Sequence, residues 1–493
     1  MLPRHTLIAL ALTGCTGVVS GSGDDDEGGG GDGGGDPVVD PADLEHGLRG
    51  TYHPIHGDAA LDRIDAAVDF AWGEAEPAAG IGADHFSVRW TGYLDVPAAG
   101  SYTFAITADD GVRLRVDGAV VIEDWTFHAP TLVEGAAELP AGFVELELEY
   151  FDVTSNAEVH LGWRGAGVDE PVLPTERLRA APRADASTGP KPPFVNPVIP
   201  FDCPDPGVAA TGDGYVMVCT GGSFPVRRSA DLIFWQDTGG AILPDGKPAW
   251  AANGGRNWAP EIHQVGEKWI AYFTSVNGGN VLSVGAAAAD APEGPYVDRG
   301  GPLVEAGVGV IDATYFRDED GAHYLLYKID GNSQGQATPI YIRALAPDGL
   351  SFAEGSAPVE ILRNDGGTWE GGVVEAPWLV KRDGTYYLFY SGNVYDERYR
   401  TGVARASAVT GPYEKHGAPI LANNGAWVGP GHGSVVPAGA LDYFVYHAWR
   451  NDGAGGNADG GRHVLVQRID WADGWPHIGD GTPATGLEAW PGE

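Results

Sequence analysis

The sequence is poor in basic residues and in long hydrophobic runs. It has 30 Lys and Arg against 68 Asp and Glu in 493 residues, so its formal net charge is -38. Such an acidic surface repels phosphate backbones, which argues against nucleic acid as a partner. The apolar stretch LIALAL at residues 7–12 is too short to cross a bilayer.

The first residues have the pattern of an export signal. Arg4 and His5 precede the apolar stretch, and the following LTGC resembles a bacterial lipobox in which Cys15 is lipidated. We predict a lipoprotein signal peptide at residues 1–15, and the alternative is an ordinary signal peptide cut nearby. Residues 16–43 form an acidic, glycine-rich tether. We therefore expect a lipoprotein of the cell envelope or cell surface, in the outer membrane of a Gram-negative source, or otherwise a secreted protein.

Cysteine is scarce, and beyond Cys15 only Cys203 and Cys219 remain. The two are equidistant from Thr211, and TGDG at residues 211–214 has the composition of a hairpin turn. We expect them to face each other across antiparallel strands and to form a disulfide in an exported protein. Two buried free thiols are the alternative.

The abundant glycine (75) and proline (36) predict an all-β protein with many turns. Residues 44–180 alternate apolar and polar residues in short runs, which is typical of a β-sandwich. The order of these runs around TADDGVRLRVDG resembles the protective-antigen-type domain of adhesins and glycosidases, which implies carbohydrate binding. In sugar-binding members paired aspartates hold calcium, and the resemblance places them at Asp109 and Asp110. Ordinary turn chemistry is the alternative for this pair.

A linker at residues 181–192 leads to a second domain at residues 193–493. Five segments of this domain repeat a short apolar strand, a Gly/Asp turn and an aromatic-rich strand, with a period of roughly 50 to 60 residues. The repeat predicts a five-bladed β-propeller. The first strand of each blade lies nearest the axis, so the residues that begin the repeats should form a ring: Asp205, Trp258, Asp312, Glu375 and His432.

Three members of this ring are carboxylic acids, which packing does not explain because clustered carboxylates repel one another. Two carboxylates across a pocket can cleave a glycosidic bond, one protonating the leaving oxygen and the other activating water. We expect Glu375 to be the proton donor, because its apolar sequence neighbours disfavour its charged form. Asp312 should keep Glu375 protonated and oriented, and Asp205 should stay ionised as the base. Trp258 offers a flat face for a sugar ring, and His432 could donate hydrogen bonds or bind a metal.

The motifs around these residues resemble glycoside hydrolase family 43. The resemblance spans the second domain and is carried, in family order, by NPVIPFDCPDPGV, NWAPEI, VIDATYFRDEDG, WEGGVVEAPWLVKRDGTYYLFYSG and GPGHGSVV. It implies hydrolysis with inversion, with Asp205 as general base, Asp312 as the acid that modulates the pKa, and Glu375 as general acid. It also implies calcium near His432 and no organic cofactor. Arg462 resembles an arginine in the family's pocket, and a surface position on an edge strand is its alternative.

From the residues and this resemblance we predict an inverting glycosidase that releases pentosyl units, above all α-L-arabinofuranosyl, from a plant-type polysaccharide such as arabinan or arabinoxylan. The loops GNSQGQATPIYIRAL and SGNVYDERYRTGVARA resemble the family's exo-arabinofuranosidases more than its β-xylosidases. A β-xylosidase and an endo-arabinanase are the alternatives within the family. A surface adhesin without catalysis is the alternative from another class, and the intact acid triplet argues against it. We expect a monomer whose partners are the polysaccharide and, through the lipid, a membrane.

Overall fold

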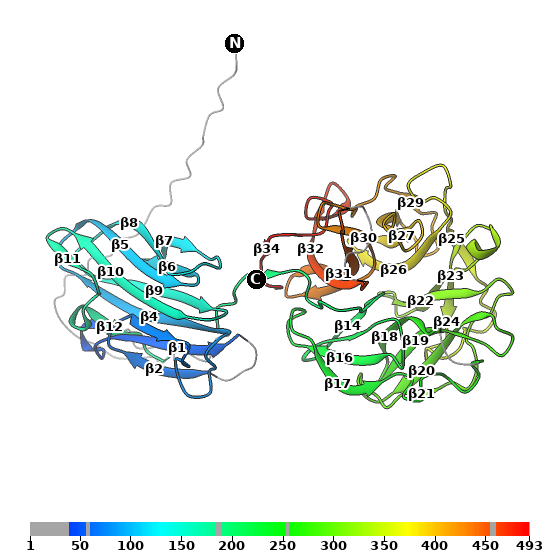
Figure 1. Cartoon of the computed structure of the whole chain (residues 1–493), viewed down its shortest axis with the longest axis horizontal. Coiled ribbons are helices and arrows are strands. Elements are labelled where there is room, and N and C mark those ends of the chain that lie inside the picture. Colours follow the sequence, from blue (N-terminus) through cyan, green and yellow to red (C-terminus); the bar gives the residue numbers. More distant parts are fainter. Residues whose placement is uncertain (1–38, 56–59, 184–188, 253–255, 454–459, 493) are drawn as a thin grey trace, which may run out of the picture.

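The computed structural model describes residues 39–55, 60–183, 189–252, 256–453 and 460–492. Two β-rich domains lie side by side, with the C-terminus between them (Figure 1). The predicted signal peptide, with Cys15, and most of the tether lie outside the described residues. In the described part of the chain, no helix has the length and apolar character needed to cross a membrane. The helical elements described there are η1 (Pro41–Asp43), η2 (Thr175–Arg177) and η3 (Asn332–Gln334).

The N-terminal domain is a sandwich of two antiparallel sheets. One sheet has the order β2-β1-β4-β9-β6-β7 with β12 beside β4, and its strands are β1 (Leu48–Pro54), β2 (Leu61–Asp65), β4 (Phe86–Val96), β6 (Val112–Val116), β7 (Ala119–Asp124), β9 (Gly142–Asp152) and β12 (Leu178–Ala180). The other has the order β11-β10-β5-β8 with β3 beside β10, and its strands are β3 (Asp69–Gly73), β5 (Gly100–Asp109), β8 (Thr131–Leu139), β10 (Ala157–Gly165) and β11 (Val168–Glu170).

Period-two alternation builds the core between these sheets. Along β4, Trp90 and Leu94 are fully buried, and Arg89 on the other face is partly exposed. A buried carboxylate, Asp65, is tolerated because it accepts hydrogen bonds from the Tyr52 hydroxyl at 2.6 Å and the Trp90 indole at 2.8 Å. The sequence pattern therefore predicted this domain's layers correctly.

The C-terminal domain consists of five four-stranded antiparallel sheets, each of which is one propeller blade. Blade 1 consists of β14 (Gly207–Thr211), β15 (Gly214–Val218), β16 (Pro225–Ser229) and β17 (Gln236–Ala241). Blade 2 consists of β18 (Trp258–Val265), β19 (Lys268–Val276), β20 (Leu282–Ala289) and β21 (Val297–Asp298). Blade 3 consists of β22 (Val310–Arg317), β23 (His323–Ile329), β24 (Ile340–Leu345) and β25 (Val359–Leu362). Blade 4 consists of β26 (Val374–Arg382), β27 (Thr385–Gly392), β28 (Arg400–Ala406) and β29 (Glu414–Lys415). Blade 5 is β30 (Trp427–Ala438), β31 (Leu441–Arg450), β32 (His463–Ala472) and β33 (Trp475–Ile478). The predicted five-bladed propeller is confirmed.

The inner strands of the blades contact their neighbours in a closed ring of β14, β18, β22, β26 and β30. The two ends of the domain complete the closure, since β13 (Phe194–Val195) pairs with β34 (Leu487–Glu488). The Asn196 side chain also exchanges two hydrogen bonds of 2.9 Å with the backbone of Val466 in blade 5. The start of every inner strand is thereby brought to the axis.

Lys191, in the linker, ties the two domains together. Its ammonium donates to the carbonyl of Ile55 at 2.6 Å, and its carbonyl accepts from the Trp125 indole at 3.0 Å. The same ammonium lies 5.6 Å from the ring centroid of Trp490, near the C-terminus. These contacts involve the sandwich, the linker and the C-terminal segment.

Candidate active site

In each blade, one non-glycine residue in the inner strand or just before it has a left-handed backbone near the axis. These residues are Asp205, Ala259, Asp312, Ala376 and His432, with φ between 42° and 55°. Pairing with the second strand also shifts register there in blades 2 to 5. Bulges and left-handed residues re-aim side chains and persist only where the surrounding structure holds them. Every blade of the repeat therefore has a local backbone conformation that directs side chains toward the axis.

Side chains of neighbouring blades hold this backbone in place. In four blades the N–H of the left-handed residue donates to a side chain of the preceding blade in the ring: Asp205 to His447, Ala259 to Thr220, Ala376 to Asp312, and His432 to Ser391. These hydrogen bonds are 2.7 to 3.0 Å long. The blades are therefore linked side by side at the site itself.

The bulges correct one detail of the predicted ring. Asp205, Asp312 and His432 occupy the left-handed position, whereas Trp258 and Glu375 come one residue before it. The five residues are therefore not equivalent in backbone position, although the sequence repeat aligned them. A bulge adds one residue to a strand without changing the apolar pattern that follows, so the repeat does not reveal it.

The bulged ends surround a cavity of about 290 Å³. All six propeller residues that the sequence proposed as catalytic or substrate-binding line it: Asp205, Trp258, Asp312, Glu375, His432 and Arg462. The described lining residues all belong to the propeller. The sandwich domain thus contributes none of the described wall.

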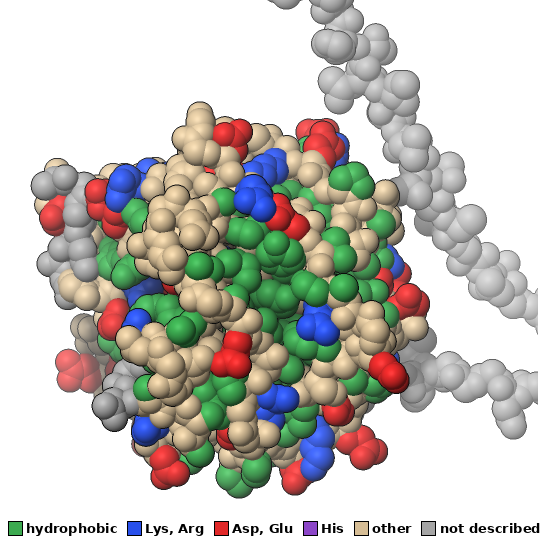
Figure 2. Space-filling model, turned by 90° about the vertical axis from the view of Figure 1, so that its right-hand side faces the viewer, with side chains coloured by type: hydrophobic (Ala, Val, Ile, Leu, Met, Phe, Trp, Pro, Cys, Tyr) green, Lys and Arg blue, Asp and Glu red, His purple; other side chains and the backbone are tan. Residues whose placement is uncertain are grey.

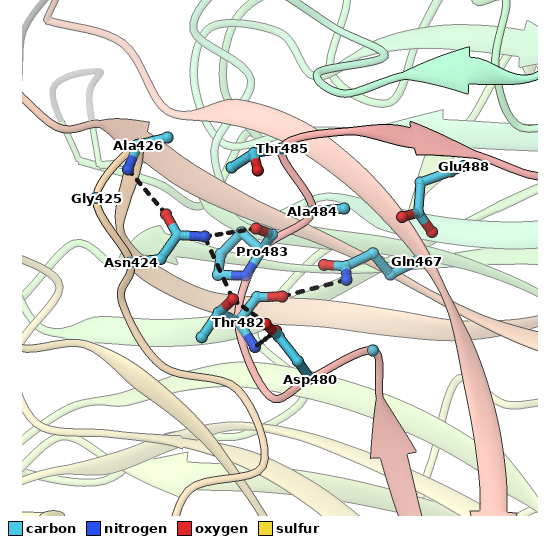
Figure 3. A pocket seen from close by; sticks show the side chains of 11 residues that line it. Asn424, Gly425, Ala426, Gln467, Asp480, Thr482, Pro483, Ala484, Thr485 and Glu488 are labelled. Carbon is cyan, nitrogen blue, oxygen red and sulfur yellow. Dashed lines mark hydrogen bonds between the residues drawn. The ribbon is translucent and has the colours of Figure 1, made fainter. Parts of the chain in front are cut away.

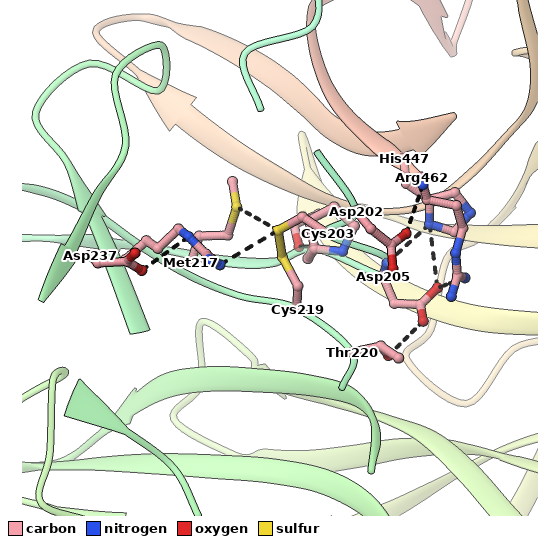
Figure 4. The surroundings of a disulfide bond; sticks show 12 residues. Asp202, Cys203, Asp205, Met217, Cys219, Thr220, Asp237, His447 and Arg462 are labelled. Atoms are coloured by element: carbon pink, nitrogen blue, oxygen red, sulfur yellow. Dashed lines mark hydrogen bonds and ion pairs between the residues drawn. A yellow bond between two sulfur atoms is a disulfide. The ribbon is translucent and has the colours of Figure 1, made fainter. Parts of the chain in front are cut away.

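Asp205 is surrounded by groups that favour its ionised form (Figure 4). Arg462 Nη1 and His432 Nδ1 lie 3.0 and 3.2 Å from its Oδ1, and the Thr220 hydroxyl donates to Oδ2 at 2.6 Å. Burial opposes ionisation, but Arg462 and His432 outweigh it and hold the pKa of Asp205 well below its usual range. Arg462 therefore lies in the cavity wall rather than on a surface edge.

His447 orients the backbone of Asp205. Its Nδ1 accepts the Asp205 N–H at 3.0 Å, and its ring stacks on Tyr399 with 5.8 Å between centroids. Burial lowers the pKa of His447 well below its usual value, so this imidazole is neutral. An acceptor Nδ1 leaves the proton on Nε2.

Glu375 has polar partners that the sequence did not predict. Lys328 Nζ donates to Glu375 Oε2 at 2.8 Å, and the Tyr399 hydroxyl donates to Oε1 at 2.9 Å. Lys328 is fully buried and also donates to Asp330 at 2.8 Å and to Asn332 at 3.2 Å. The expectation of an apolar wall around Glu375 was therefore wrong, because sequence neighbours on a strand point to alternate faces and the contacts come from other strands.

Asp312 is a buried acid next to Glu375. Its Oδ2 accepts the N–H of Ala376, the residue after Glu375, at 3.0 Å. The pKa of Asp312 is raised to about 7, because burial and the charge of Glu375 raise it by more than His432 and Lys328 lower it. Below that pH Asp312 is protonated, next to Glu375.

Two aromatic residues line the cavity at different depths. Trp258 is partly buried, and Tyr395 is 64% exposed. Tyr395 follows β27 and was not predicted as a site residue, although the sequence of its loop was compared with that of exo-arabinofuranosidases. An exposed aromatic residue beside buried acids marks the mouth of the cavity.

The disulfide joins Cys203 to Cys219, with 5.2 Å between their Cα atoms (Figure 4). Its placement differs from the sequence interpretation. Gly207 pairs with Val218 at the start of the hairpin, so Cys203 lies before the first strand and has no cross-strand partner. The bond instead fastens the segment that carries Asp205 to the end of β15.

The predicted metal ligands do not form a complete ligand set in the described residues. These residues contain no group of three or more His, Cys, Asp or Glu that could hold a metal ion. In the sandwich, both carboxylate oxygens of Asp110 accept backbone N–H groups, from His128 at 2.9 Å and Val153 at 3.0 Å. Burial and then Asp110 raise the pKa of Asp109. Calcium at Asp109, Asp110 or His432 stays a prediction.

A second cavity, of about 580 Å³, lies beside blade 5 (Figure 3). Its polar side chains bind one another: Asn424 donates to the Pro483 carbonyl at 2.6 Å, and Asp480 accepts from the N–H and hydroxyl of Thr482. It lacks the facing buried carboxylates of the axial cavity among its lining residues. The axial cavity is therefore the candidate active site.

The surface of the propeller is less one-sided in charge than the composition. On the face that points away from the sandwich, Lys and Arg are interspersed with Asp and Glu around a central hydrophobic area (Figure 2). Much of the negative charge lies elsewhere, including the acidic tether.

Two family models match the chain. The model for glycosyl hydrolases family 43 matches residues 194–476, and the model for the PA14 domain matches residues 44–177. The first match covers more than half of the chain and the whole axial site.

Known proteins agree with these matches. A xylan 1,3-beta-xylosidase of Vibrio sp is 28% identical over 60% of this chain and 59% of its own length, and an extracellular exo-alpha-(1->5)-L-arabinofuranosidase of Cellvibrio japonicus is 25% identical over 56% and 86%. The crystal structure of a thermostable family-43 glycoside hydrolase is 28% identical, with a TM-score of 0.54, over 60% of this chain and 99% of that one. The chain spans 21% and 59% of the lengths of the first two curated relatives that it matches.

Proposed function

The chain belongs to glycosyl hydrolases family 43 and carries an N-terminal PA14 domain, and from this premise we propose that it is an inverting glycosidase. In our proposal it releases α-L-arabinofuranosyl units from a plant-type polysaccharide such as arabinan or arabinoxylan. The observation that carries the proposal is the axial cavity, where acids in two electrostatic environments face one space. Asp205 is held ionised, and Asp312, next to Glu375, retains a proton because its pKa is raised. Pairs of acids whose pKa values are pushed apart divide the roles of base and acid between them.

The proposed reaction is a single displacement. Asp205 takes a proton from a water molecule, whose oxygen attacks the anomeric carbon. Glu375 gives its proton to the glycosidic oxygen, and the bond from that oxygen to the anomeric carbon breaks. The attack comes from the face opposite the leaving group, so the configuration inverts. Arg462, Thr220 and His447 orient Asp205 for this step, and Lys328 and Tyr399 orient Glu375.

The relatives include a xylan 1,3-beta-xylosidase and an exo-alpha-(1->5)-L-arabinofuranosidase, and the two loop sequences favour arabinofuranosyl. A panel of nitrophenyl pentosides, linear arabinan and xylan tests the choice. Proton NMR of the first-formed pentose should show the inverted anomer. Release of the retained anomer would contradict single displacement, and release of no sugar from any substrate would favour a carbohydrate-binding adhesin.

The pH dependence of activity tests the acid pair. We expect kcat/KM to fall as pH rises through about 7, because Asp312 then loses its proton and the acid side of the cavity no longer holds the proton that the glycosidic oxygen needs. On the acid side of the profile, Asp205 stays ionised at pH values below the usual pKa range of an aspartate, because its own pKa is lowered. The profile should therefore be flat through mildly acidic pH.

Lys328→Met should move the alkaline limb of that profile to higher pH. Lys328 lowers the pKa of Asp312, so removing its charge raises the pH at which Asp312 deprotonates, by about one unit or more. Lys268→Met, at an exposed lysine at the start of β19, is the matched control and should leave the profile unchanged. A Lys328→Met profile that stays in place, or moves to lower pH, would refute this electrostatic role.

We also propose that the protein is exported and anchored through Cys15. Relatives in Cellvibrio japonicus and Bacillus subtilis are named extracellular, and the Cys203–Cys219 disulfide suits an oxidising compartment. Mass spectrometry of the mature N-terminus decides the matter. A chain that begins at a lipidated Cys15 supports the anchor, and an unlipidated chain that begins elsewhere contradicts it.

A further inference from the structure

The loop between β27 and β28 connects the mouth of the cavity to the acid on its floor. Tyr395 in this loop is 64% exposed, and its side chain lines the cavity. Tyr399, four residues later, is almost fully buried, at 1% exposed, and donates to Glu375 Oε1 at 2.9 Å. One short segment therefore carries both an open aromatic ring and a contact to the proposed proton donor.

The loop is fixed by its own hydrogen bonds. At its start, the N–H of Asn393 donates to the carbonyl of Glu370 at 2.8 Å. Near its end, the N–H of Tyr399 donates to the carbonyl of Asp396 at 3.0 Å, and the Asn423 side chain donates to the carbonyl of Glu397 at 2.7 Å. Tyr395 thus projects from a braced loop.

The guanidinium of Arg462 lies over one face of the Tyr395 ring. Its guanidinium carbon lies 5.7 Å from the Tyr395 ring centroid, and its Nη1 lies 3.0 Å from Asp205 Oδ1. The orientation of the mouth aromatic is therefore linked to the position of the proposed base. A tyrosine that is braced in this way yet largely exposed presents a rigid, amphipathic face at low entropic cost to a ligand.

The depth of the three acids, compared with the exposed position of Tyr395, indicates on which side of the scissile bond the Tyr395 ring lies. The three carboxylic acids, at 7 to 8% exposed, lie deep in the cavity, so the sugar whose anomeric carbon reacts must reach the floor. The next sugar, which leaves with the glycosidic oxygen, must then lie toward the mouth and beside Glu375, which protonates that oxygen.

We propose that Tyr395 is the platform of a leaving-side subsite, on which the sugar ring after the scissile bond stacks. The inference rests on the proposed function and adds to it: the preferred substrates are glycans with a second sugar ring on the leaving side. Stacking there also holds the glycosidic oxygen against Glu375 through the shared loop.

Tyr395→Ala, assayed on two substrates of the same pentose, tests the subsite. The disaccharide has a leaving-side ring, and the pentosyl fluoride has none. We expect kcat/KM for the disaccharide to fall by about tenfold and that for the fluoride to stay within about twofold of wild type. Tyr395→Phe keeps the ring and should retain disaccharide activity.

The outcomes separate this inference from the proposed function. An equal loss on both substrates would show a general structural effect, and no loss on the disaccharide would show that nothing stacks on Tyr395; either result overturns the subsite. Hydrolysis of neither substrate by the wild type would overturn the proposed function, and the subsite with it. Retained fluoride activity also shows that the variant is folded.

Discussion

Glu375→Gln should lower kcat/KM for oligosaccharides by about 10²- to 10⁴-fold, the range that a general acid contributes. The amide has the shape of the carboxyl group, and its oxygen can still accept from Lys328, which donates to Glu375 at 2.8 Å. What it loses is the proton for the glycosidic oxygen. A dinitrophenyl pentoside needs no such proton because its leaving group is already a weak base, so its hydrolysis should fall far less.

The contrast between leaving groups is the decisive measurement. Glu414→Gln makes the same change on the outermost strand of the same blade, where the side chain is 67% exposed, and should leave both rates unchanged. If Glu375→Gln reduces oligosaccharide and dinitrophenyl pentoside hydrolysis by the same factor, Glu375 is not the proton donor. A thermal melt of each variant identifies any loss that comes from unfolding.

The repeat in the sequence was sufficient to predict the propeller and the convergence of its acids. Each blade repeats an apolar strand, a turn and an aromatic strand, and the closure of such units brings the inner strands to one axis. That geometry predicted the convergence of Asp205, Asp312 and Glu375, because only a shared site explains acids at the start of several inner strands. The roles of these acids came from chemistry, not from periodicity.

The partners of the acids were harder to predict. Lys328 reaches Glu375 from another blade, a contact that depends on how two sheets pack rather than on the spacing along either. A signal was nevertheless present: Lys328 follows LLY in an apolar strand, just as Glu375 stands in an apolar run. Charged residues are seldom buried without a partner, so two buried charges of opposite sign in adjacent blades suggest each other.

Single-residue backbone irregularities explain the remaining differences. The bulge at Ala376 shifts the register of its strand by one residue, and Asp205 has a left-handed backbone just before β14 begins. Cys203 also lies before its hairpin, outside the paired residues. Periodicity averages over such local departures. The sequence therefore predicts which residues converge better than it predicts their exact backbone position.

Asp205→Asn should lower kcat/KM by about 10²- to 10⁴-fold on every substrate, whatever its leaving group. Asparagine tolerates the left-handed backbone that Asp205 adopts, at φ 55°, and it can still accept from Thr220, so the fold should survive. The amide cannot take a proton from water, and the attack of water is required whether the leaving group is a sugar or a dinitrophenolate. Asp213→Asn, in the exposed turn of the same blade, is the matched control and should keep wild-type rates.

The independence from the leaving group is what distinguishes the base from the acid. Arg462 and His432 lie 3.0 and 3.2 Å from Asp205 Oδ1, and they would face a neutral amide in the variant. If a dinitrophenyl pentoside is spared in Asp205→Asn as it is in Glu375→Gln, then Asp205 assists departure rather than attack, and its assignment as the base fails. A uniform loss in one variant and a selective loss in the other is the combination that single displacement requires, because only the attacking water is common to all substrates.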